Sequence, residues 1–161
     1  MIVSILTFIY FGLELIAIGA GAMALFGFLT GILLNKWVVL FLKCSLATSV
    51  TGLLVPSSHF TLTQGASMLS VYLAGVAVWA WHKFHLTGVW RSIFALSTTL
   101  VLYLNIVVAI TQAFKQISLF KAPIEADFDL PFIATQSVVL TIFAVLGLIA
   151  VKRFRHRPSH Q

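Results

Sequence analysis

Apolar residues dominate the chain in long runs, and the most informative run extends from Trp90 to Phe114. With about 25 residues and one charge, near its start, this run has the length and composition of a membrane-spanning helix. Because an amide without a partner in hydrocarbon is costly, its polar side chains should face other helices, and we expect this helix to lie at the centre of a bundle. The polar residues recur every seven positions, close to two helical turns, and so form one slowly drifting stripe: Arg91, Thr98, Asn105 and Gln112.

Smaller side chains complete the predicted packing faces. Thr98, Val101 and Val108 lie on the side of the stripe and are predicted as helix-packing positions. Small residues at helical spacing, which let neighbouring backbones approach closely, mark one face in each of the first three apolar runs. The clearest of them are Ala20, Ala24, Gly27 and Gly31 in the first run, Ser45, Ser49 and Gly52 in the second, and Ala66, Ser70 and Ala77 in the third.

Together the apolar runs predict an all-α integral membrane protein, a bundle of five transmembrane helices. The spans are expected at about 5–31, 37–56, 64–81, 90–114 and 131–151, with Asn35 and Lys36 as the tight connection between the first two. Residues 1–151 then form a single transmembrane domain, and residues 152–161 form a basic cytoplasmic tail.

The composition supports an integral membrane protein and excludes some classes of partner. The chain has 161 residues, of which 60% are hydrophobic and 9% charged, and its mean hydropathy is +1.06, whereas about a quarter of the residues of a soluble domain are charged. The net charge of +6 would suggest nucleic-acid binding in a soluble protein, but here the basic residues sit at span ends, so no nucleic-acid partner is expected. The single cysteine, Cys44, excludes an intrachain disulfide and a CxxC site.

The distribution of Lys and Arg predicts the orientation. With five spans, one side of the membrane receives Lys115 and Lys121 and the other receives eight basic residues, which should be cytoplasmic. The N-terminus is therefore expected outside and the C-terminus inside, with the basic residues near anionic lipids of the inner leaflet. The eight predicted anchors are Lys36, Lys43, Lys83, Arg91, Lys152, Arg153, Arg155 and Arg157.

Glu14 is the most informative single residue, because a carboxyl within a membrane span is costly and is a functional-site hypothesis by default. Folding the first hairpin about Asn35 places Glu14 near the level of Pro56 to His59, about 20 Å from Lys43 in height, too far for an ion pair. We predict an outward-facing polar pocket; the alternatives are a hydrogen-bonded packing role and a position at the headgroups. The predicted pocket residues are Glu14, His59, Asn105, Gln112 and Gln136, with Gln64 as a further neighbour.

No cofactor, metal site or catalytic residue is predicted. A bis-histidine haem needs histidines that face each other from different helices, and none of the five lies mid-span. His82 and His85 have no obvious third metal ligand, and Glu125, Asp127 and Asp129 lack the spacing of a calcium loop. Walker, Rossmann, nucleophile-elbow and HExxH motifs do not occur in the sequence.

Four segments carry a resemblance: residues 45–56, residues 88–91, residues 102–105 continuing to 112–114, and the end that runs from 131–132 to 152–154. In these segments the chain resembles a group of small bacterial polytopic inner-membrane proteins that have no established activity. The resemblance extends over most of the chain from about Gly27. It implies a multi-pass protein of the bacterial inner membrane and the same number of spans, but no catalytic role.

Three functions follow as hypotheses. The preferred one is a structural or accessory membrane protein, as a homo-oligomer or a partner in a larger membrane complex. The alternative is a proton or small-solute carrier, channel or sensor whose polar pocket surrounds Glu14 and Asn105. A further alternative is a membrane redox or lipophilic-substrate protein, with quinone or haem near the histidine-bearing helix ends.

Overall fold

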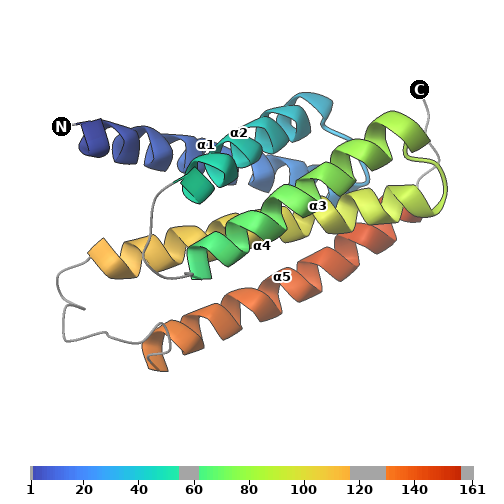
Figure 1. Cartoon of the computed structure of the whole chain (residues 1–161). Coiled ribbons are helices and arrows are strands. Elements are labelled where there is room, and N and C mark those ends of the chain that lie inside the picture. The colour runs from blue at the N-terminus through green and yellow to red at the C-terminus, as the bar shows by residue number, and fades with distance from the viewer. Residues whose placement is uncertain (1, 55–61, 117–129, 157–161) are drawn as a thin grey trace.

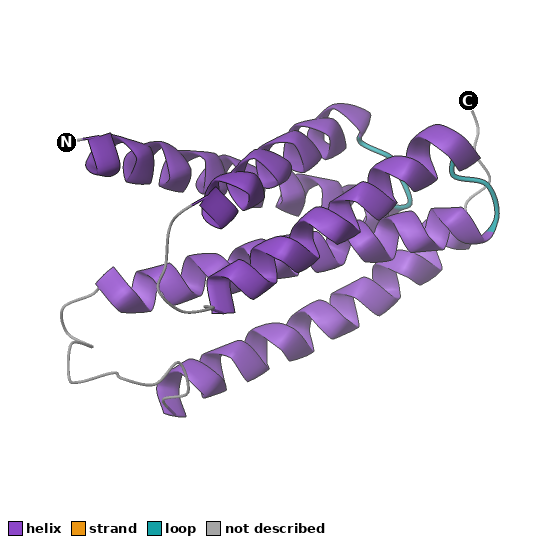
Figure 2. Ribbon diagram, viewed as in Figure 1, coloured by secondary structure: helices purple, strands orange, loops and turns teal. Residues whose placement is uncertain are grey.

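The computed structural model describes residues 2–54, 62–116 and 130–156, which form five α-helices and the short links between them (Figures 1 and 2). Each helix is long and apolar enough to cross a membrane, as a multi-pass membrane protein requires, so the all-α bundle of five such helices is confirmed. The helices are α1 (Ile2–Thr30), α2 (Asn35–Leu54), α3 (Leu62–Phe84), α4 (Val89–Gln116) and α5 (Leu130–His156).

Two of the boundaries that differ from the sequence prediction are the end of α5 and the link between α1 and α2. Helix α5 continues to His156, into the predicted tail, because Lys and Arg are good helix formers and suit the negative end of the helix dipole. The link between α1 and α2 consists of residues 31–34, and the predicted connection, Asn35 and Lys36, instead begins α2.

Gly31 explains the early end of α1. Its φ of 75° is in the left-handed region, where glycine carries no side-chain penalty. The amide of Ile32 donates to the carbonyl of Gly27 at 2.8 Å, and the amide of Gly31 donates to that of Phe28 at 3.1 Å. These two bonds are the Schellman pattern, which satisfies the last carbonyls of a helix.

Helix α4 is the central helix of the bundle, since it packs against each of the other four, as the stripe predicts. Thr98, Val101, Asn105 and Val108 are all buried along it. Helix α1 crosses α4 closely at Gly21, where an added Cβ would lie 2.6 Å from Leu102 Cδ1. The outer surface carries large apolar side chains, which suits a bundle surrounded by lipid.

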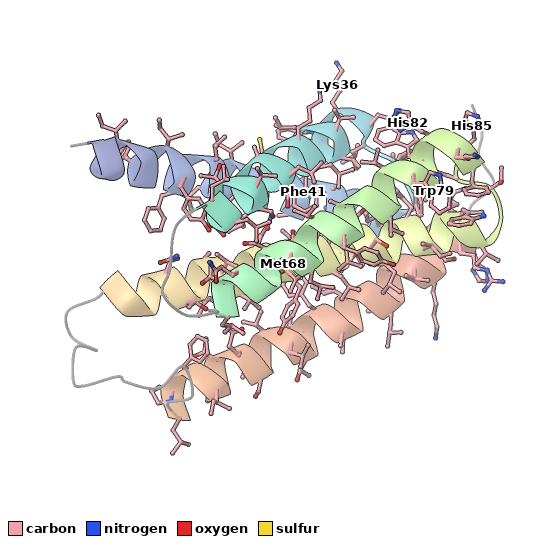
Figure 3. All side chains as sticks on the ribbon, in the orientation of Figure 1. Lys36, Phe41, Met68, Trp79, His82 and His85 are labelled. Carbon is pink, nitrogen blue, oxygen red and sulfur yellow. The ribbon has the colours of Figure 1, made fainter. Side chains whose placement is uncertain are left out.

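The two ends of the bundle differ in character. Histidine and tryptophan side chains lie towards the end opposite the N-terminus, where Figure 3 shows Trp79, His82 and His85. Phe28, Phe94 and Phe154 form the buried aromatic cluster there. The half of the bundle that holds the N-terminus is packed with smaller and more polar side chains, and it contains the cavity described next.

Candidate functional site

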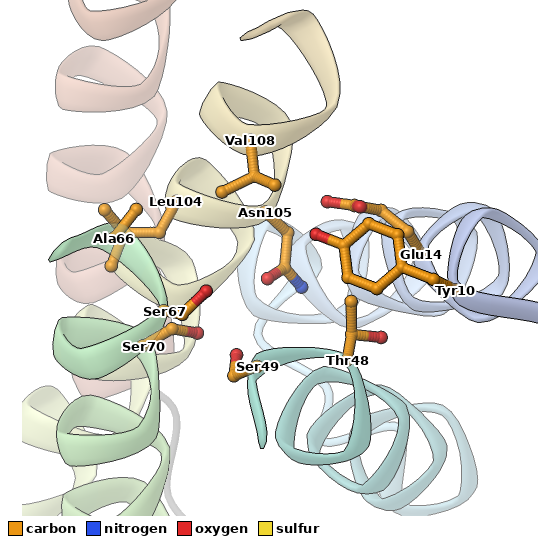
Figure 4. Close-up of a pocket in the computed structure, with 10 residues that line it drawn as sticks. All are labelled: Tyr10, Glu14, Thr48, Ser49, Ala66, Ser67, Ser70, Leu104, Asn105 and Val108. Atoms are coloured by element: carbon orange, nitrogen blue, oxygen red, sulfur yellow. The ribbon is translucent and has the colours of Figure 1, made fainter. Parts of the chain in front are cut away.

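A small polar cavity lies where α1, α2, α3 and α4 meet (Figure 4). Each helix contributes about one turn of side chains, because residues three or four apart share a helix face. Seven of the ten lining residues carry a polar side chain, an unusual concentration within apolar helices. The cavity is lined by Tyr10 and Glu14 of α1, Thr48 and Ser49 of α2, Ala66, Ser67 and Ser70 of α3, and Leu104, Asn105 and Val108 of α4.

Glu14 is the only carboxyl side chain among the residues that the structure describes, and it is 2% exposed. Both of its carboxyl oxygens are buried, and no other helix in the described part of the chain donates a hydrogen bond to them. The hydroxyl of Tyr10, one turn earlier on α1, is placed to interact with the carboxyl as a hydrogen-bond donor, and Figure 4 shows this hydroxyl turned towards it. Because an ionised carboxylate with so few partners is very costly to bury, this position favours a proton, a water molecule or a cation at the carboxyl.

Asn105 is held firmly beside this carboxyl. Its amide nitrogen donates to the hydroxyl oxygen of Ser45 at 3.0 Å, and that hydroxyl lies 3.3 Å from the amide oxygen of the same residue. Both side chains are buried. The pair ties α2 to α4 at the edge of the cavity and fixes the orientation of the carboxamide.

The hydroxyl groups of the cavity fall into two kinds. Thr48 donates to the carbonyl of Cys44 at 2.8 Å and is satisfied by its own helix. The hydroxyl oxygen of Ser70 is buried and has no hydrogen-bond partner among the described residues, like the oxygens of Glu14. The cavity therefore contains polar groups on two helices that are left for a bound species to satisfy.

The size of the cavity limits that species. The volume open to the centre of a water-sized sphere is about 10 Å³, and a single water molecule needs roughly that much. The cavity accommodates a water molecule, a proton carried on the carboxyl or a small cation, but not an organic solute.

The structure brings together two of the predicted pocket residues, Glu14 and Asn105. Gln112 is half-buried on α4, two turns beyond Asn105, and does not line the cavity. Gln136 is half-buried on α5, a helix that contributes no residue to the cavity, and its amide nitrogen and oxygen lack partners among the described residues. His59 lies outside the described residues.

The predicted depth of Glu14 needs correction. The level expected from the sequence, between Pro56 and His59, is outside the described residues, and Glu14 instead shares its cavity with Thr48 and Ser49. The link between the helices is centred near residues 32 and 33, and not on Asn35. Thr51 is as many residues after that centre as Glu14 is before it. It lies within one helical turn of Thr48 and Ser49, which are the neighbours observed.

Five polar residues of the cavity were not predicted as pocket residues: Tyr10, Thr48, Ser49, Ser67 and Ser70. Ser49 and Ser70 do occur in the small-residue faces predicted for packing. The signal that could have added Tyr10 and Ser67 is helical spacing, since Tyr10 lies four residues before Glu14 and Ser67 three before Ser70.

The predicted anchors are mostly exposed. Arg91 is half-buried, and Arg157 lies outside the described residues. Within the described ranges, no three His, Cys, Asp or Glu side chains come together as ligands for a metal. The six exposed anchors are Lys36, Lys43, Lys83, Lys152, Arg153 and Arg155.

The fold and the cavity define a class: a multi-pass helical membrane protein with a buried carboxyl in a polar cavity between its helices. Comparison with known proteins adds no narrower identity, because no family model, no curated protein and no solved structure matches the chain. The resemblance to small bacterial inner-membrane proteins therefore has no support from these comparisons.

Proposed function

We propose that this protein binds and releases a proton at Glu14 within the membrane, as part of a proton carrier, channel or sensor. The observation that carries the proposal is the burial of both carboxyl oxygens without a hydrogen-bond partner on any other described helix, with Tyr10 of the same helix as the neighbouring donor. A carboxyl kept only for packing would be expected to bond to a neighbouring helix, as Asn105 bonds to Ser45.

The surroundings of the carboxyl support a proton over a larger ligand. The cavity has room for about one water molecule, and its hydroxyl groups can both donate and accept hydrogen bonds. A water molecule in the cavity would give the carboxyl of Glu14 a hydrogen-bond partner and provide a step for proton transfer.

The orientation and location belong to the same proposal. With eight basic residues on one side of the membrane and two on the other, the N-terminus is outside and the C-terminus is cytoplasmic. The Glu14 cavity then lies in the outer half of the membrane. The resemblance described above favours the bacterial inner membrane.

The test compares wild type with Glu14→Gln, which keeps the size of the side chain but cannot ionise. Infrared difference spectra between acidic and basic buffer should contain a band of a buried carboxyl that is absent from Glu14→Gln. Thr111→Val is the matched control, since Thr111 is equally buried but lies outside the cavity and bonds to its own helix. The proposal is wrong if wild type and Glu14→Gln give the same carboxyl bands.

A flux measurement then separates carriage from sensing. In liposomes loaded with a pH-sensitive dye, with the membrane potential clamped by potassium and valinomycin, a carrier or channel should dissipate a pH gradient faster than Glu14→Gln does. A titrating Glu14 without such flux indicates a sensor.

A second candidate function, a structural component that assembles through α5, rests on a different observation. Buried residues make up 6% of the most apolar stretch of α5, against 56% for α4. Ser137 and Thr141 donate their hydroxyls to carbonyls of their own helix, so they need no water. Small residues that let two helices approach closely form one exposed row on α5: Ala134, Ser137, Thr141 and Ala144.

Assembly is tested by the mass of the purified protein in detergent. Thr141→Leu should convert an oligomer to a monomer, because the larger side chain separates the helices. Gly75→Leu is the control: Gly75 is also exposed, with no atom within 4 Å of an added Cβ, but it lies on α3. A wild type that is already monomeric excludes this candidate.

A further inference from the structure

Arg91 occupies a defined position at the end of the bundle opposite the Glu14 cavity. It lies in the first turn of α4, and its guanidinium carbon is 4.3 Å from the centroid of the Phe154 ring of α5. Phe154 is buried and packs against Phe28 with 5.0 Å between ring centroids. Because a guanidinium is attracted to the face of an aromatic ring, this buried platform holds the Arg91 side chain in place.

The guanidinium of Arg91 makes no hydrogen bond among the residues described. Its Nε atom is buried, whereas its two Nη groups are not buried. An arginine stays charged in proteins, and a charged donor without an acceptor in a partly buried position is costly. An acceptor from outside the protein would bond to the two Nη groups.

The charge around Arg91 indicates that the acceptor is an anion. The one carboxyl side chain in the described part of the chain, that of Glu14, lies in the other half of the bundle. Arg153 directly precedes Phe154, and its Nη1 donates to the carbonyl of Leu29 at 3.2 Å, which fixes a second guanidinium at the same level.

Aromatic side chains beside Arg91 place it at the level of lipid headgroups. Trp90 stacks on Phe84, with ring centroids 3.8 Å apart and ring planes at 5°, and Trp79 lies edge-on to Trp90 at 5.8 Å. Tryptophans gather at the interface between membrane and water, where their amphipathic rings are favoured. An anion that reaches Arg91 from the surrounding membrane is therefore a lipid headgroup.

We propose that Arg91 binds the phosphate of an anionic phospholipid headgroup. The two Nη groups of an arginine lie in one plane, as a fork that matches two oxygens of a phosphate, and such charge-assisted hydrogen bonds are stronger than those between neutral groups. The platform of Phe154 holds the fork before the lipid arrives, which lowers the cost of binding. This site is independent of Glu14, so Glu14→Gln should bind lipid as wild type does.

The experiment measures the rise in apparent melting temperature of the full-length protein in neutral detergent as phosphatidylglycerol is added. Phosphatidylcholine and inorganic phosphate are added in parallel to separate an anionic lipid from a zwitterionic one and from a soluble anion. Arg155→Gln is the control, because Arg155 is exposed at the same end of the bundle and its replacement removes one positive charge, as Arg91→Gln does. The melting temperatures of wild type and Arg155→Gln should rise equally with phosphatidylglycerol. The apparent affinity of Arg91→Gln should fall about tenfold or more.

Two results would overturn the proposal. Equal losses of affinity in Arg91→Gln and Arg155→Gln mean that only the general surface charge attracts lipid. If inorganic phosphate, at the same concentration as phosphatidylglycerol, raises the melting temperature equally or prevents the lipid from doing so, the ligand is a soluble anion. If Arg91→Gln does not fold, Arg91→Lys decides: it keeps the charge but lacks the fork, so weakened binding supports the site and unchanged binding refutes it.

Discussion

Replacing Glu14 and replacing Asn105 should affect stability in opposite directions, although both side chains line the same cavity. Glu14 has two buried oxygens without a hydrogen-bond partner on any other described helix, whereas Asn105 exchanges hydrogen bonds with Ser45 of a neighbouring helix. We therefore compare Glu14→Leu with Asn105→Leu, two substitutions that each put the same apolar side chain into the cavity.

The magnitudes follow from what each substitution leaves behind. A buried polar group without a partner costs about 1–3 kcal/mol, so Glu14→Leu removes a cost of this order. The changed shape of the side chain costs up to about 1.5 kcal/mol, which leaves the variant between about 0.5 kcal/mol less stable and about 3 kcal/mol more stable than wild type. Asn105→Leu strands the hydroxyl of Ser45 in a buried position, so it should destabilise the protein by about 1–3 kcal/mol.

The assay is reversible denaturation in mixed micelles, with the fluorescence of the four tryptophans reporting unfolding as the fraction of denaturing detergent increases. The double substitution Ser45→Ala with Asn105→Leu is the internal control, because it removes both partners and should recover part of the loss. The reasoning is refuted if Glu14→Leu loses as much stability as Asn105→Leu. In that case the carboxyl bonds to a group that the structure does not show, and Glu14 is a packing residue.

Three glycine or serine positions make further predictions for the same denaturation assay. Gly21→Ala should cost about 1–3 kcal/mol because its Cβ would lie 2.6 Å from Leu102 Cδ1 in a packed core, while Gly19→Ala, with no atom within 4 Å, should be neutral or slightly stabilising. Gly31→Ala should cost about 1–2 kcal/mol since φ is 75°; an unchanged stability would contradict the cap. Ser70→Ala should be neutral or stabilising by up to about 1 kcal/mol, because its hydroxyl has no partner among the described residues, and a clear loss would indicate a hidden partner.

The sequence predicted the spans and the central helix because lipid imposes a simple rule. A polar side chain within a span must turn towards the protein, so the period of seven in α4 predicts a buried face, and Thr98 and Asn105 are buried there. The count of five helices needed only the length of the apolar runs.

The cavity was predicted in part, since the strongly polar side chains carry a signal that hydroxyl groups do not. Thr48 and Thr99 donate to carbonyls one turn earlier in their own helices, so a serine or threonine in a span shows no preference for a cavity. The depth of Glu14 depended on where the first link begins, and a shift of a few residues at Gly31 changed its neighbours. Long-range pairings such as Ser45 with Asn105, 60 residues apart, are set by how the helices cross, which no local pattern specifies.

The distribution of polar groups in the bundle argues that Glu14 is retained for a role other than folding. Packing alone could be achieved by small apolar residues, as Ala74, Ala77 and Ala80 achieve it on α3, where all three are fully buried. In contrast, the half of the bundle around Glu14 gathers hydroxyl groups and an amide whose orientation is fixed by Ser45, and it leaves the most costly group, the carboxyl, without a hydrogen-bond partner on any other described helix. Polar groups that a fold leaves unsatisfied at one place are expected where a bound species satisfies them. Since the space there admits about one water molecule, the exchange of a proton through that water is the simplest event that would use this arrangement.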